Sequence, residues 1–171
     1  MNKCVRQVAF ACTVFLASFP LWGAGNNPLY SLELDALMNL ERVSLGDYKH
    51  QILVVTVFEP QCPWCMKQFK ALEDLYQNCA NHLQPVAVGV GDKKGLKEIV
   101  YKTKISFPAA VASPDFIAMV GEPKATPFSL IIDDNGDLVT TIEGYVPLAK
   151  LRYAFQDVCL ADAVAQTSIS G

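Results

Sequence analysis

A β-branched segment that runs directly into a pair of closely spaced cysteines most constrains the fold of this chain. Residues Ile52–Phe58 form a nearly continuous apolar run, typical of a strand that is covered on both faces of a sheet. The motif Cys-Pro-Trp-Cys follows at residues 62–65. Its Pro63 suits the first position of a helix, where the missing N–H costs nothing. The sequence therefore predicts a strand-to-helix junction with Cys62 at the N-terminus of the helix.

The rest of the chain alternates short apolar strands with helical segments, which indicates an α/β fold. Extended pieces are expected within 32–43, 85–90, 107–111, 128–133 and 138–143, and helices at 62–79, 96–103, 115–120 and from Pro147 onward. Between the last two strands, Asn135-Gly136 predicts a tight hairpin with positive φ at both residues. The pattern favours a central mixed sheet flanked by helices, with an N-terminal β extension.

The N-terminus has the order of a secretory signal. Two basic residues, Lys3 and Arg6, precede an apolar run that ends near Trp22, and small residues follow at 23–25. We expect a cleaved signal peptide at 1–25, a single domain at 26–165 and a flexible tail at 166–171. An uncleaved membrane anchor is the alternative, although about 15 apolar residues are few for a span that needs about 20.

Composition excludes several classes of function. The 171 residues are 51% hydrophobic and 18% charged, which is typical of one globular domain and not of a disordered chain. The net charge of −3 and the pI near 5.3 disfavour a nucleic-acid partner. With only two histidines, His50 and His82, a histidine-rich metal site is also disfavoured.

The Cys62–Cys65 pair carries the chemistry of the chain. A C-x-x-C motif serves a redox pair, half a zinc site or a structural disulfide. No second C-x-x-C is present to complete a zinc tetrahedron. Free N–H groups and the positive end of a helix stabilise a thiolate at Cys62, whereas Cys65 lies one turn inside the helix. This placement favours redox chemistry, with Cys62 as nucleophile and Cys65 as resolving thiol.

A second motif, Thr126-Pro127 directly before a strand, completes a family resemblance. Residues 43–65 and the stretch from Thr126 through the Asn-Gly hairpin to the last helix resemble the exported TlpA/ResA type of redoxin, within the thioredoxin-like superfamily. The resemblance implies a thioredoxin fold and a cis Pro127 that packs against the disulfide. It also implies that the backbone of Thr126 pairs with an extended substrate segment. Pro63 and Trp64 would support the site, Trp64 being exposed beside the sulfur or packed over the helix start.

The chain departs from the family pattern at three positions. The usual aromatic residue before the first cysteine is Gln61, and the positions that hold proton-handling acids in relatives are Thr56 and Gln68. Glu59 is the nearest acid along the chain. The sequence therefore secures no general base for Cys65.

Two further cysteines, Cys79 and Cys159, are expected to form a structural disulfide. In a thioredoxin-like sheet the helices that carry them lie on the same face and run in the same direction, so their ends meet at the pole opposite Cys62. The alternative is two buried free thiols, because free cysteine is often a core residue.

Together these features predict an exported thiol–disulfide oxidoreductase, periplasmic if the source is Gram-negative, that acts on cysteines of exported proteins. The resemblance favours reduction over oxidation. The expected partners are substrate proteins and an upstream membrane thiol donor or acceptor, without nucleic acid, cofactor or metal; membrane contact is expected only if the N-terminal segment stays uncleaved. The alternatives are a copper-handling chaperone for oxidase assembly and a non-catalytic adaptor. A copper site of that kind would need a distant histidine beside the cysteine pair, and the sequence has no histidine after His82.

Overall fold

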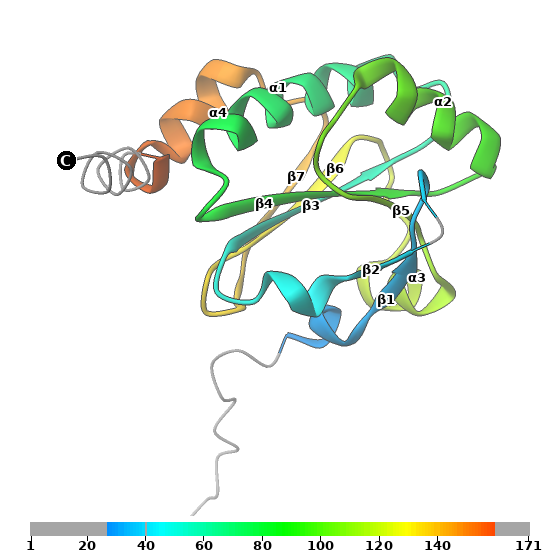
Figure 1. The fold of residues 1–171 in the computed structure, drawn as a ribbon, viewed down its shortest axis with the longest axis horizontal. Helices are drawn as coiled ribbons and strands as arrows, with labels where there is room; N and C mark the ends of the chain where they lie inside the picture. The colour runs from blue at the N-terminus through cyan, green and yellow to red at the C-terminus, as the bar shows by residue number, and fades with distance from the viewer. Residues whose placement is uncertain (1–26, 40, 160–171) are drawn as a thin grey trace, which may run out of the picture.

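A five-stranded mixed sheet forms the centre of the molecule (Figure 1). The computed structural model describes residues 27–39 and 41–159. The strand order is β5 (Ala109–Val111), β4 (Leu83–Gly89), β3 (Ile52–Phe58), β6 (Phe128–Ile132) and β7 (Leu138–Glu143). Strands β3, β4 and β5 are mutually parallel, and β6 runs antiparallel to both β3 and β7. Strands β3 and β7 therefore point the same way.

Helices and a small β extension cover the two faces of the sheet. One face carries α1 (Pro63–Cys79), α2 (Lys93–Thr103) and α4 (Leu148–Ala154). The other carries α3 (Pro114–Val120), the 3-10 turns η1 (Pro28–Ser31) and η2 (Leu45–Tyr48), and the hairpin of β1 (Glu33–Asp35) and β2 (Arg42–Ser44). Each face has its own apolar cluster, and β3 contributes to both, since six of its seven residues are buried. The predicted α/β class, with helices on a mixed sheet, is confirmed.

Strand β4 begins before the point that the sequence indicates. The sequence predicts a start at Pro85, whereas a proline rarely lies inside a strand. The structure begins it at Leu83 and pairs Pro85 with Val54 of β3. Strand β5 pairs only with 87–89 of β4, so Pro85 lies where β4 has a single neighbour. A missing N–H is tolerated there because no ladder bond is lost.

The hairpin between β6 and β7 is present, but its turn differs from the predicted two-residue type. Only Gly136 has a positive φ, of 88°, and Asn135 does not. The Gly136 N–H donates to the Asp133 carbonyl at 3.0 Å, while the Asp133 carboxylate accepts from the N–H groups of Asn135 and Asp137. The aspartate thus organises a longer turn, so that one left-handed residue suffices.

Helix α2 begins three residues earlier than expected because Asp92 caps it. The Asp92 carboxylate accepts from the Gly95 N–H at 2.9 Å. Replacing Asp92 with Ala removes this bond, and we expect a loss of about 1 kcal/mol in the free energy of unfolding. Urea denaturation of both proteins measures the loss. Asp92→Asn, which keeps an accepting oxygen, should stay close to wild type; an equal loss in both variants would contradict the capping role.

The expected signal peptide at 1–25 and the tail at 166–171 lie outside the described residues. The expected domain at 26–165 also extends beyond them at both ends. In the part of the chain that the structure describes, no helix has the length and apolar character needed to cross a membrane.

Candidate active site

The Cys62–Cys65 disulfide lies where β3 leads into α1, at the carboxyl end of the parallel strands. Cys62 is the N-cap of α1 and Pro63 occupies its first turn. The two Cα atoms are 5.2 Å apart. The Cys62 Sγ accepts from the Cys65 N–H at 3.1 Å, so a main-chain donor of the first helical turn points at this sulfur. Cys65 is fully buried and Cys62 is half-buried. An incoming sulfur can therefore reach Cys62 and not Cys65.

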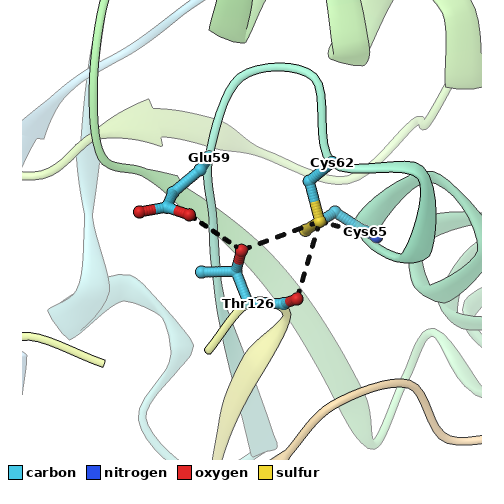
Figure 2. The surroundings of a disulfide bond; sticks show 4 residues. All are labelled: Glu59, Cys62, Cys65 and Thr126. Carbon is cyan, nitrogen blue, oxygen red and sulfur yellow. Dashed lines mark hydrogen bonds between the residues drawn. A yellow bond between two sulfur atoms is a disulfide. The ribbon is translucent and has the colours of Figure 1, made fainter. Parts of the chain in front are cut away.

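The segment before β6 brings Thr126 against the disulfide (Figure 2). The Thr126–Pro127 peptide bond is cis. The Thr126 carbonyl oxygen lies 3.6 Å from the Cys62 Sγ, and the Thr126 Oγ1 lies 3.7 Å from the same atom. The Thr126 hydroxyl donates to the Glu59 carboxylate at 3.1 Å. Residues from two segments 64 positions apart thus meet at one sulfur atom.

Trp64 forms an exposed aromatic surface next to the disulfide. Its side chain is 54% exposed and stacks on Tyr145, with ring centroids 5.8 Å apart. The Lys67 ammonium lies 4.0 Å from the centroid of the Trp64 ring, within the range of a cation–π contact. The indole therefore packs against Tyr145 and Lys67, while more than half of its side chain stays exposed.

The two positions at which relatives carry acids are buried and neutral here. Thr56 is fully buried, and its hydroxyl lies 3.0 Å from that of Ser129. Gln68 is 2% exposed, and its Oε1 accepts from the Val146 N–H at 2.7 Å. Gln68 thus ties α1 to the chain that leads into α4.

Removing that acceptor should destabilise the protein. Gln68→Met keeps the length of the side chain and leaves the Val146 N–H without this bond. We expect a loss of about 1–3 kcal/mol in the free energy of unfolding. Urea denaturation measures the loss, and hydrogen exchange at the Val146 amide should become faster. Unchanged amide protection would show that the bond contributes nothing.

The Cys79 and Cys159 sulfurs form a second disulfide at the far end of α1. Their Cα atoms are 4.7 Å apart, and 80 positions separate them in the sequence. Cys79 is fully buried at the last residue of α1, and Cys159 lies beyond α4. On the surface nearby, Arg152 donates to Asp74 at 2.7 Å and also joins α4 to α1. The free-thiol alternative does not describe this structure.

Two features of the site carry no clear signal in the sequence. Gln61 adopts a φ of 59°, in the left-handed region that non-glycine residues rarely enter. It turns the chain between β3 and Cys62. The hydrogen bond between the Thr126 hydroxyl and the Glu59 carboxylate also has no sequence signal, because it joins side chains that are 67 positions apart. Among residues 27–39 and 41–159, no group of three or more histidine, cysteine or acidic side chains is placed to hold a metal ion.

Comparison with known proteins identifies the family. A family model described as Redoxin matches residues 24–154, most of the chain, and the protein belongs to the redoxin family. The resemblance found in the sequence is confirmed at this level. A comparison with curated proteins finds no match.

Solved structures share the fold. A secreted Mycobacterium tuberculosis disulfide oxidoreductase, homologous to Escherichia coli DsbE, superimposes with a TM-score of 0.65 at 14% identity, covering 79% of this chain and 98% of its own. A putative thiol:disulfide interchange protein DsbE from Chlorobium tepidum gives a TM-score of 0.63 at 21% identity, with coverages of 77% and 92%. StoA from Bacillus subtilis gives 0.58 at 16% identity, with coverages of 71% and 93%.

Proposed function

We propose that this redoxin is an exported thiol–disulfide oxidoreductase that reduces disulfides of other exported proteins through Cys62. The observation that carries the proposal is the position of Cys62: half-buried, at the N-cap of α1, with a main-chain N–H directed at its sulfur. Such a position stabilises the thiolate, which is the reactive form. Two of the similar structures, a secreted disulfide oxidoreductase and a putative thiol:disulfide interchange protein, support export and thiol chemistry.

The exchange takes two balanced steps. The Cys62 thiolate attacks one sulfur of a substrate disulfide; the substrate S–S bond breaks, a mixed disulfide forms, and the leaving sulfur takes a proton. The Cys65 thiolate then attacks the Cys62 Sγ, which releases the second substrate sulfur as a thiol and forms the Cys62–Cys65 disulfide. The substrate is reduced by two electrons and the protein is oxidised by two. An upstream thiol donor is needed to return the pair to its reduced state.

Reduction of oxidised insulin by the pre-reduced full chain tests the proposal. We expect one disulfide of insulin to be reduced for each Cys62–Cys65 pair, with catalytic turnover when dithiothreitol is supplied. The matched control is the variant Cys62→Ser with Cys65→Ser, which keeps the second disulfide. If this control reduces insulin as fast as the wild type, the proposed function is wrong. Titration of the pair in glutathione buffers then gives the direction: a reductant stays oxidised until reduced glutathione is in large excess.

A further inference from the structure

The Thr126 hydroxyl lies between a carboxylate and the sulfur that faces a substrate (Figure 2). Its Oγ1 is 3.1 Å from the Glu59 Oε2 and 3.7 Å from the Cys62 Sγ. Glu59 is exposed and lies just beyond β3, three residues before Cys62. One hydroxyl group therefore connects an acidic side chain to the proposed nucleophile.

The hydrogens of this arrangement can be assigned from chemistry. A hydroxyl has one hydrogen, and an ionised carboxylate can only accept, so Thr126 donates to Glu59. The oxygen then presents only lone pairs to the Cys62 Sγ. The Thr126 carbonyl, 3.6 Å from the same sulfur, presents lone pairs as well. Both oxygens can accept a hydrogen bond from a thiol, and both repel a thiolate.

We propose that Glu59 is a positioning residue that orients the Thr126 hydroxyl and thereby favours the thiol of Cys62 over its thiolate. The effect of Glu59 on the Cys62 thiol does not depend on the proposed function; only its consequence for disulfide reduction rests on that function. A reduced form with a less stabilised thiolate gives a more reducing pair, which agrees with the reductant direction. Glu59 thus acts on the same thiol as the first turn of α1 and in the opposite sense.

Other charged groups lie on the elements that meet at Cys62 and contribute to the electrostatic environment of its sulfur. Lys67 on α1 lies against Trp64. Glu122 and Lys124 are exposed on the segment before Thr126, and Asp92 is engaged with the Gly95 N–H. Among the contacts of the Cys62 sulfur, the Cys65 N–H is the donor that favours the thiolate. The experiment must therefore distinguish an effect of Glu59 that is transmitted by the Thr126 hydroxyl from the summed electrostatic effect of these charges.

The role of Glu59 is tested by measuring the rate of alkylation of Cys62 as a function of pH. The full chain carrying Cys65→Ala is treated with iodoacetamide from pH 5 to 9, and the modification is measured on the Cys62 peptide by mass spectrometry. Glu59→Gln keeps the shape and removes the charge. We expect the midpoint pH of alkylation to fall by about 0.5–1 unit, so that the rate at pH 6 rises about threefold to tenfold. An unchanged or higher midpoint would overturn the proposal.

Paired variants test whether Glu59 acts through Thr126. Thr126→Val should lower the midpoint and Thr126→Ser should leave it near its original value. Adding Glu59→Gln to Thr126→Val should then cause little further change. A full additional shift in that background would mean that Glu59 acts as an independent surface charge, and it would refute the role of Thr126. Glu122→Gln, with the same loss of charge on the neighbouring segment, should leave the midpoint unchanged; a shift equal to that of Glu59→Gln would refute the proposal as well.

The readout is independent of disulfide exchange. Alkylation needs neither a substrate nor Cys65, so a protein that fails to reduce insulin but shows the expected shifts would refute the proposed function and retain this inference. A protein that reduces insulin but shows no shift of the alkylation midpoint would retain the proposed function and refute the role of Glu59.

Discussion

The Cys65→Ser variant should accumulate a mixed disulfide with its substrate, whereas Cys62→Ser should lose exchange activity by about two orders of magnitude or more. The reason is geometric. Cys62 is half-buried and faces the approach, so it can attack without its partner. Cys65 is fully buried, so we expect that it cannot replace Cys62, but it lies where it can attack the Cys62 sulfur and resolve the mixed disulfide.

Trapping on oxidised insulin measures both outcomes. Each variant is reduced, freed of reductant and mixed with insulin, and the products are separated on a non-reducing gel. The linkage is then mapped by peptide mass spectrometry, because the full chain also carries Cys4 and Cys12. A complex joined through Cys65 in the Cys62→Ser variant would reverse the assignment of roles.

Removing the second disulfide should cost about 4 kcal/mol in the free energy of unfolding. The variant carries Cys79→Ala together with Cys159→Ala. The bridge spans 80 positions, and a long closed loop restricts the unfolded chain strongly in the chain-entropy model. Alanine avoids a buried hydroxyl at position 79, which is fully buried.

A matched control separates loop length from the loss of two sulfurs. Cys62→Ala with Cys65→Ala removes a disulfide that spans only three positions, and the same model gives it about 1–2 kcal/mol. Urea denaturation of both double variants and the wild type measures the difference. Equal losses in the two variants, or a loss below 1 kcal/mol at Cys79 and Cys159, would contradict the structural role.

Much of the fold was predictable because its strongest signals are local. Strand β3 is buried on both faces, so its apolar run is uninterrupted. Helix α1 begins at Pro63, directly after Cys62 as its N-cap, and the sequence indicates this junction. The position of Cys79 and Cys159 at one pole was predictable through the family resemblance, which implies a thioredoxin-like sheet in which β3 and β7 run in the same direction, as they do in the structure.

The rest depended on interactions that single positions do not reveal. The turn before β7 is organised by the Asp133 side chain, which outweighed the expected Asn-Gly geometry. Pro85 fits inside β4 because β5 is short, a fact about a neighbour rather than about Pro85. Glu59 is connected to the site by a hydrogen bond from Thr126, which is 67 positions away in sequence. Side-chain contacts across the fold therefore set the limit of the prediction.

Both disulfides lie at the ends of a single helix, and a helix has a direction. Cys62 is at the amino end of α1, where free N–H groups stabilise a sulfur anion, and Cys79 is at the carboxyl end, where free carbonyl groups oppose one. Exchange proceeds through thiolates, so the polarity of α1 activates one bridge and protects the other. Burial alone would not distinguish the reactivity of the two disulfides, because each pair has one fully buried and one half-buried cysteine. Under the proposed function, the direction of α1 thus lets the Cys62–Cys65 disulfide undergo exchange while the Cys79–Cys159 disulfide stays closed.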